Sequence, residues 1–289
     1  MPELPEVETV ARGLRTVLPG RRILDIHLGK TDFIDDPAAI ERELPGARIA
    51  GVRRFGKFLL LDLERSNKIR SNGSPDQFSL QVHLGMTGQL VTCPPDARIK
   101  PHTHVFLALD DGRELRYTDI RRFGRIRIID SGAREAILGE FGLDPLEASE
   151  QEFSVKIRTR NARIKALLLD QRVLRGIGNI YADESLWRAR IHPKRLGANL
   201  KGRELRRLFQ KVQQVLREAI RLGGSSVSDY VNSNGEPGEF QLRHRVYMRE
   251  GKKCFRCGTR IRRDIVAGRS SYFCPRCQWA PRPSRKNAN

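Results

Sequence analysis

Apolar side chains close to the N-terminus recur every three or four residues, at Val7, Val10, Leu14 and Val17. This spacing predicts an amphipathic helix that begins just after the initiator methionine. Pro5 suits the first turn of that helix, and the glutamates around it suit the positive end of the helix dipole. The helix therefore accounts for every residue of MPELPEVETV except Pro2.

Residues 21 to 130 contain runs of apolar residues that predict strands. The runs are RRILDIHLG, RIAGVRRFGKFLLLDLE, FSLQVHLGMTGQLVTC and THVFLALDDGRELRYTDI. In the last run, Asp111-Gly112 separates two alternating segments, as expected for a tight hairpin. Residues 65–77 are polar and turn-forming, which predicts a surface loop. Together these features predict a β-sandwich.

From about residue 134 the apolar spacing becomes helical. The helical runs are ALLLDQRVL, YADESLWRAR and LRRLFQKVQQVLREAIRL. The last run stops at Gly223-Gly224, which is typical of a helix C-terminus. The segment GGSSVSDYVNSNGEPGEF follows it and is too long for a simple connection, so we expect a functional lid there.

Composition limits the class of protein. The 289 residues suggest about two domains, and 39% apolar with 30% charged residues is typical of a globular chain. No run is long and apolar enough for a membrane span, and the acidic start is unlike a secretory signal, so we expect a cytoplasmic protein.

The net charge of +20 is far beyond what solubility needs. Residues 241–289 contain 14 basic and 2 acidic residues, which is a surplus of 12. A polyanion such as DNA is the favoured partner, because neutralising phosphates releases counterions. The alternatives are a solvated basic surface and, less favoured, an anionic membrane surface.

The C-terminal region carries two CxxC pairs, Cys254 with Cys257 and Cys274 with Cys277, sixteen residues apart. This spacing is typical of a four-cysteine zinc site, with disulfides as the alternative. Four thiolates fill a tetrahedron, so the single Zn²⁺ would be structural. Cys93 has no partner in the sequence and is interpreted as a small strand residue.

Four arginines lie between the two cysteine pairs, at Arg260, Arg262, Arg263 and Arg269. A rigid basic hairpin suits a DNA groove or its phosphates. The alternative is that these arginines keep a small module soluble.

Pro2 becomes a free secondary amine if Met1 is removed, as expected before such a small side chain. An α-amino group has a pKa of about 7.7 to 8.0, so part of it is nucleophilic at neutral pH. Attack on an aldehyde-like carbon gives an iminium ion, whose charge acidifies the adjacent carbon and permits elimination. Glu3 is the neighbouring proton donor and acceptor.

Five separated motifs together resemble the formamidopyrimidine-DNA glycosylases, a family of bacterial base-excision repair enzymes. They are PELPEVET, LGMTGQL at 84–90, DIRRFGR at 119–125, GIGNIYADE at 176–184 and the zinc motif. The resemblance runs in order from Pro2 to Cys277.

The family's α+β fold is thereby implied: an N-terminal helix with a two-layer β-sandwich, then a helical domain with a helix-two-turn-helix and a four-cysteine zinc-finger β-hairpin. The implied domains are a catalytic domain at 1–133, a helical DNA-binding domain at 134–250, a zinc finger at 251–278 and a basic tail at 279–289.

By this resemblance, Pro2 attacks the deoxyribose C1′ of a damaged purine nucleotide and expels the base. The Schiff base then undergoes β and δ elimination, so one site is both glycosylase and DNA lyase. Glu3 matches the catalytic acid, and Lys57 and Arg269 match basic residues that contact DNA and complete the catalytic set.

Further residues match the family's DNA contacts. The nucleotide must be flipped out, and Met86, Arg121 and Phe123 match the trio that fills the gap. The other matching residues are Glu6, His102, Lys165 and Asn179. Helix capping is an equally good interpretation of Glu6. For His102, a structural position at a strand edge is favoured over a phosphate contact. The segment 225–240 corresponds to the loop that closes over an everted oxidised guanine.

The implied partner is double-stranded DNA with an oxidised purine or an abasic site, bound by a monomer without membrane association. Two features depart from the family pattern, the insertion at 65–77 and the extension WAPRPSRKNAN. Two alternatives stay open: an endonuclease VIII-like enzyme for oxidised pyrimidines, and a zinc-ribbon nucleic-acid-binding protein without catalysis.

Overall fold

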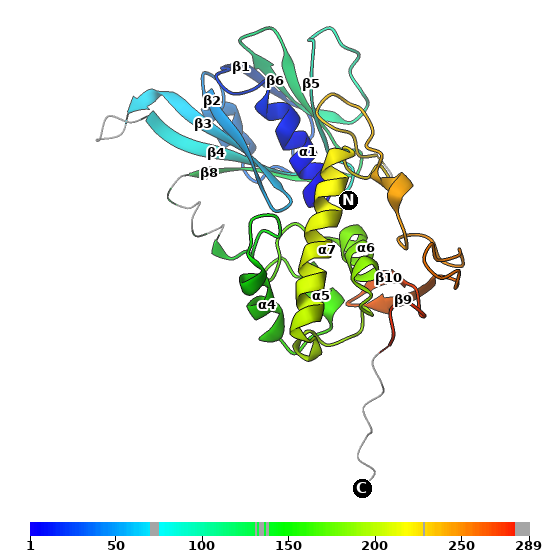
Figure 1. Cartoon of the computed structure of the whole chain (residues 1–289). Helices are drawn as coiled ribbons and strands as arrows, with labels where there is room; N and C mark the ends of the chain where they lie inside the picture. The colour runs from blue at the N-terminus through cyan, green and yellow to red at the C-terminus, as the bar shows by residue number, and fades with distance from the viewer. Residues whose placement is uncertain (70–74, 131, 133–135, 137–138, 228, 281–289) are drawn as a thin grey trace. The chain divides into compact units, whose positions relative to one another are not determined.

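The computed structural model describes residues 1–69, 75–130, 132, 136, 139–227 and 229–280 (Figure 1). The chain forms two compact units. The first comprises Met1–Glu140 and Ala219–Gln241, and the second comprises Phe141–Glu218 and Leu242–Asn289. Residues 219–241 thus join the N-terminal unit, which a linear division of the chain does not anticipate. The boundary expected at 133 and 134 lies outside the described residues.

The first unit begins with helix α1, Leu4–Arg15, as the apolar spacing predicts. Val7, Val10 and Leu14 are fully buried, and the helix packs against β2 and β3. A second short helix, α2 (Pro37–Glu43), was not predicted. It begins where the Asp36 carboxylate accepts the Ala39 amide at 2.9 Å, an N-cap that the sequence analysis did not use.

Eight strands form two four-stranded antiparallel sheets, which confirms the predicted sandwich. One sheet has the order β1-β6-β7-β5 and the other β2-β3-β4-β8. The strands are β1 Ile23–Leu28, β2 Arg48–Phe55, β3 Phe58–Ile69, β4 Pro75–His83, β5 Gln89–Cys93, β6 Thr103–Leu109, β7 Glu114–Thr118 and β8 Arg125–Asp130. Apolar residues of α1 and both sheets form one core. The Asp111-Gly112 hairpin joins β6 to β7, and Cys93 is a half-buried residue of β5.

The prediction of a surface loop at 65–77 is wrong for most of that segment. Strand β3 continues to Ile69 and β4 starts at Pro75, with Glu64 paired to Gln77; residues 70–74 lie outside the described residues. Arg65 explains how polar residues extend the sheet here. Its guanidinium binds three carboxylates and lies 4.4 Å from the centre of the Phe78 ring. The carboxylates are those of Glu43, Asp76 and Asp130, at 2.6, 2.7 and 3.1 Å.

The second unit is helical and ends in a two-stranded hairpin. Its main elements are α4 Glu150–Arg158, α5 Ile164–Leu169, α6 Asn179–Ala189, α7 Gly202–Arg221, β9 Arg262–Val266 and β10 Arg269–Phe273. The described residues also include two short 3-10 turns, η1 Gly197–Asn199 in the second unit and η2 Phe240–Arg243 where the chain passes from the first unit to the second. The helix expected in ALLLDQRVL ends at Leu169, because the following residues turn. Helix α7 ends before Gly223, as predicted, and its final residues from Ala219 belong to the first unit.

Among the described helices, none has both the length and the apolar character required to cross a bilayer. The end of the basic tail, residues 281–289, lies outside the described residues.

Candidate functional site

The start of α1 holds the two residues predicted to carry the chemistry. Pro2 is buried, Glu3 is 3% exposed and Met1 is 46% exposed. Glu3 is the N-cap, and its extended backbone turns the chain into the helix at Leu4. The N-terminal motif therefore places a proline and a carboxylate together at the positive end of a helix dipole.

Glu6 fixes this turn and ties it to a distant loop. Its Oε2 accepts the Glu3 amide at 2.8 Å, and its Oε1 accepts the Ser225 amide at 2.7 Å. The Tyr230 hydroxyl donates to the Glu6 carbonyl at 3.2 Å. Glu6 is only 1% exposed. The helix-capping interpretation of Glu6 is thus confirmed, and its predicted contact with DNA stays a prediction.

Gly224 permits this approach of the loop to α1. Its φ is +86°, and a side-chain Cβ at this position would lie 3.0 Å from Glu6 Oε1 and 2.9 Å from the Tyr230 ring. A larger residue would therefore separate the loop from the helix and strain the backbone.

Glu8 joins α1 to the turn that carries Lys57. Glu8 Oε2 accepts a hydrogen bond from Arg54 Nε at 2.9 Å. Glu8 Oε1 accepts hydrogen bonds from Arg12 Nε at 2.9 Å and from Arg15 Nη1 at 3.0 Å. Burial raises the pKa of Glu8, but these arginines outweigh it and hold the pKa below its ordinary value. Lys57 is half-buried in the turn between β2 and β3.

His83, the last residue of β4, adjoins the LGMTG turn. Burial lowers the pKa of His83 to about 4, and the charges of Lys57 and Arg125 act in the same direction. The ring is therefore neutral at pH 7, and its Nδ1 accepts the Gly85 amide at 3.2 Å. A neutral histidine thus orients the backbone just before Met86.

The predicted gap-filling residues lie on two adjoining turns. Met86 is 36% exposed and Phe123 is 53% exposed, so both are among the large apolar side chains that the first unit leaves at its surface. The Arg121 guanidinium lies 4.5 Å from the centre of the Phe123 ring. At Gly85 a Cβ would lie 2.4 Å from the Phe123 backbone, so only glycine lets these turns meet.

Asp119 organises these turns, and sequence reasoning missed its role. It is fully buried, and its carboxylate accepts the Gly124 amide at 2.8 Å, the Tyr117 hydroxyl at 3.1 Å and the Thr87 hydroxyl. The Asp119 amide donates to the carbonyl of exposed His102, whose φ is +65°. The signal available in the sequence was an acidic residue inside the DIRRFGR motif.

In the second unit, Lys165 and Asn179 both donate to one carbonyl. Lys165 Nζ lies 2.8 Å, and Asn179 Nδ2 3.0 Å, from the Ser270 oxygen in the zinc hairpin. Lys165 is 0% exposed and forms an ion pair with Asp183 at 2.7 Å. Both side chains thus hold Ser270, the neighbour of Arg269, and their contacts with DNA stay predictions.

The acidic residues of GIGNIYADE anchor two further segments, and sequence reasoning missed them. Asp183 Oδ2 accepts the Tyr272 amide at 2.9 Å. Glu184 Oε1 accepts three consecutive amides, those of Arg245, Val246 and Tyr247, at 2.8 to 3.0 Å. Both are at most 1% exposed, and burial raises the pKa of each.

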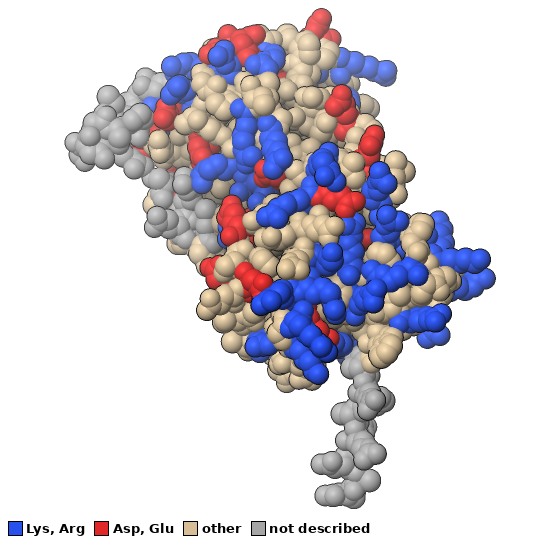
Figure 2. All heavy atoms as spheres, viewed as in Figure 1, with Lys and Arg blue, Asp and Glu red and all other residues tan. Residues whose placement is uncertain are grey.

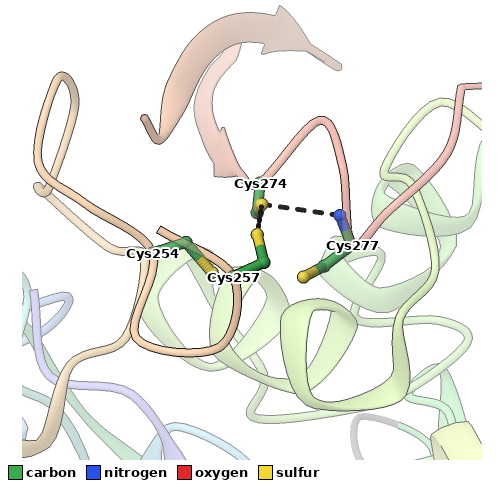
Figure 3. Close-up of side chains that lie close together, drawn as sticks. All are labelled: Cys254, Cys257, Cys274 and Cys277. Carbon is green, nitrogen blue, oxygen red and sulfur yellow. Dashed lines mark hydrogen bonds between the residues drawn. The ribbon is translucent and has the colours of Figure 1, made fainter. Parts of the chain in front are cut away.

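The four predicted zinc ligands meet at one point (Figure 3). Their sulfur atoms all lie within 4.8 Å of one another, and those of Cys257 and Cys274 are 3.4 Å apart. Zinc–sulfur bonds of about 2.3 Å place tetrahedral sulfurs about 3.8 Å apart, so the set fits a closed structural site. The Arg256 amide points at Cys254 Sγ and the Cys277 amide at Cys274 Sγ, each at 3.5 Å.

Arg269 is exposed on the hairpin that this site supports, opposite Val266 in the β9–β10 pairing. Arg260, Arg262 and Arg263 are also exposed. Figure 2 shows that Lys and Arg side chains outnumber carboxylates on the visible surface. The arrangement suits a phosphate backbone.

Three family models match the chain in order. They are the formamidopyrimidine-DNA glycosylase N-terminal domain at residues 1–126, its H2TH domain at 141–231 and the zinc finger found in FPG and IleRS at 251–278. Curated formamidopyrimidine-DNA glycosylases of Pelotomaculum thermopropionicum and Solibacter usitatus are 43% and 42% identical. Each alignment covers 96% of this chain and 99% of the relative.

Solved structures are similar over the same length. A Lactococcus lactis FPG variant in complex with Fapy-dG DNA has a TM-score of 0.85 at 34% identity, and so does MutM in complex with carbocyclic 8-oxo-G DNA. Each comparison covers 96% of this chain and 100% of the other. With these matches and the geometry of its two units, the chain belongs to the formamidopyrimidine-DNA glycosylase family.

Proposed function

We propose that this protein is a bifunctional DNA glycosylase and abasic-site lyase that removes oxidised purines, 8-oxoguanine and formamidopyrimidines, from double-stranded DNA. The single observation that carries the proposal is the buried Pro2-Glu3 pair at the start of α1, in a chain that matches the family from end to end. Membership of the family supplies the reaction class, and the residues supply the roles.

The nucleophile in this proposal is the Pro2 nitrogen after removal of Met1. It attacks C1′ of the damaged nucleotide, and the C1′–N bond to the base breaks with a proton donated to the leaving base or sugar by Glu3. The sugar ring then opens: the C1′–O4′ bond breaks, O4′ takes a proton, and the nitrogen lone pair forms the C=N bond of an iminium ion. The iminium acidifies C2′, so that loss of a proton from C2′ expels the 3′ phosphate. A second elimination expels the 5′ phosphate and leaves a one-nucleotide gap.

In this proposal, side chains of the first unit fill the space that the flipped nucleotide leaves in the base stack. Met86 and Phe123 are exposed and apolar, as a wedge between bases requires, and Arg121 can hydrogen-bond the orphaned base. Lys57 and His102 in the first unit, and Arg269 in the second, supply phosphate contacts. Asn179 supplies another at the start of α6, where a helix N-terminus favours anions.

Borohydride trapping tests the chemistry. Mature protein incubated with abasic-site DNA and borohydride should give a covalent adduct, and peptide mapping by mass spectrometry should locate it on the Pro2 nitrogen. The matched control is Pro5→Ala, which keeps Pro2 and should still be trapped. An adduct on a lysine, or no adduct in fully processed protein, would contradict the proposal. The second of these results would favour a binding protein without catalysis.

The oxidised-pyrimidine alternative has one observation in its favour, since Lactococcus lactis FPG has been crystallised with DNA containing an oxidised pyrimidine. Excision of 8-oxoguanine opposite cytosine should nevertheless exceed excision of thymine glycol at equal enzyme concentration. The opposite ranking would assign the protein to the pyrimidine class.

We further propose that the protein acts as a monomer in the bacterial cytoplasm. The similar curated proteins come from bacteria. The DNA-contacting residues proposed above all come from one chain, so the reaction does not require a second copy.

A further inference from the structure

Trp187 lies on α6 beside the four-cysteine site. It is 7% exposed and packs in one cluster with Val246, Ile261 and the ligand cysteines Cys254 and Cys274. Residues from outside the two cysteine loops thus cover part of the site.

Arg256 fixes the plane of the Trp187 ring. Its guanidinium carbon lies 4.2 Å from the ring centre, and its Nη1 donates to the Trp187 carbonyl at 3.3 Å. Arg256 also belongs to the first cysteine knuckle, between Cys254 and Cys257. The indole is therefore held by the same short loop that carries two of the ligands.

The indole N–H of Trp187 is a donor that lies in the same cluster as the cysteine sulfurs. Trp187 Nε1 is buried and has no hydrogen-bond partner among the described residues. Cys254 packs with Trp187 in the same cluster and offers the indole a sulfur acceptor. A buried donor left without a partner is costly, so a sulfur acceptor is the favourable arrangement.

We propose that Trp187 is an outer-sphere residue of the zinc site, whose Nε1–H donates to the Cys254 thiolate. Four thiolates around Zn²⁺ carry a net charge of −2, and N–H donors directed at sulfur disperse that charge. The backbone amide of Arg256 already points at Cys254. The indole adds a second donor to the same ligand and slows its dissociation from the metal.

Trp187→Phe tests this inference, because it keeps an aromatic ring in the cluster and removes the N–H. Zinc transfer from the full-length protein to a chromogenic chelator should become roughly three- to tenfold faster, as expected for the loss of one hydrogen bond. In Co²⁺-substituted protein the sulfur-to-cobalt charge-transfer band should move to lower energy, because the thiolate loses a donor.

Trp279→Phe is the matched control. Trp279 is the other tryptophan, follows the last knuckle closely and is 77% exposed. Its replacement should change neither the transfer rate nor the cobalt band. Wild-type values of both in Trp187→Phe would overturn the inference and leave Trp187 as a packing residue.

A second measurement does not depend on how Trp187→Phe folds. In the Trp279→Phe protein, Trp187 is the sole tryptophan, and its fluorescence should change when zinc is removed and recover when zinc is restored. Emission that is indifferent to the metal would contradict a contact between the indole and a ligand.

Discussion

The Glu6 carboxylate accepts the Ser225 amide at 2.7 Å across 219 residues of sequence. This bond connects α1, the helix that follows Pro2, to the segment 225–240, which by family resemblance corresponds to the loop that closes over an everted oxidised guanine. Together with the Glu3 amide, it places two backbone donors on one buried carboxylate.

Glu6→Gln should loosen this connection. A glutamine can accept from one of the two amides but presents an NH2 group to the other, which costs about 1 to 3 kcal/mol in the free energy of unfolding. We expect excision of 8-oxoguanine to fall well below wild type, with cleavage of abasic DNA retained. Chemical denaturation and parallel nicking assays check this. Glu41→Gln, an exposed carboxylate on α2, is the control, and an equal loss of both activities would contradict a role confined to the loop.

Glu3→Gln should nearly abolish base removal, because a neutral amide cannot donate the proton that the leaving group needs. The affinity for lesion DNA should stay within a few-fold of wild type. Single-turnover excision and a binding titration at fixed salt measure the two effects separately. If binding collapsed in parallel, Glu3 would be a structural cap and not the acid.

Lys165→Met should destabilise the second unit by about 3 to 5 kcal/mol, because it leaves the buried Asp183 carboxyl without its ion-pair partner. Combining it with Asp183→Leu should recover part of that loss. Urea denaturation measures the effect, and Lys201→Met, at an exposed position, should be neutral. Unchanged stability together with weaker DNA binding would instead show that Lys165 acts mainly on DNA.

Acid should weaken the protein through its buried histidines. Burial lowers the pKa of His244 to about 4, with the Arg249 charge acting in the same direction. The unfolded chain therefore takes up a proton first, near the ordinary histidine pKa of about 6.5. The contribution of neutral, buried His244 to the free energy of unfolding is complete above that pH and is lost as the pH falls toward 4.

The pH dependence of unfolding tests this with His244→Gln, which has nothing to titrate. Between pH 7 and pH 5 the wild type should lose about 1 to 2 kcal/mol more stability than the variant. His83 and His192 also have lowered pKa values and remain in both proteins, so the difference isolates His244. Parallel curves would show that folding does not lower the pKa of His244.

Removal of zinc should weaken DNA binding by tenfold or more, roughly the effect of losing one or two charge-assisted phosphate contacts. The hairpin that presents Arg269 depends on the four ligands for its shape, whereas the Pro2 amine lies in the other unit. Electrophoretic or fluorescence titrations before and after chelation measure the change, with zinc restored as the control. Unchanged affinity would exclude the hairpin from the interface.

Local patterns predicted the elements whose cause is local. The spacing of Val7, Val10 and Leu14 gave α1, Asp111-Gly112 gave the β6–β7 hairpin, and the cysteine spacing gave the metal site. The site residues themselves came from motif resemblance, since Met86 and Phe123 considered alone would be assigned to a core.

What sequence reasoning missed depends on partners far along the chain. The polar segment that begins at Arg65 continues a strand because three carboxylates from separate elements neutralise it. Asp119 and Glu184 were not singled out, because their roles lie in backbone amides that only the folded chain brings to them. The order of residues along the chain does not by itself show which of them pair in the folded protein.

Asp183 and Glu184 are neighbours on one turn of α6, yet one binds β10 and the other binds the segment that leads into the first cysteine knuckle. The segments that precede the two cysteine pairs are thereby attached to the same helix. Engineering of the hairpin tip between Val266 and Arg269, to change its length or charge for a different DNA geometry, can proceed with that attachment left intact.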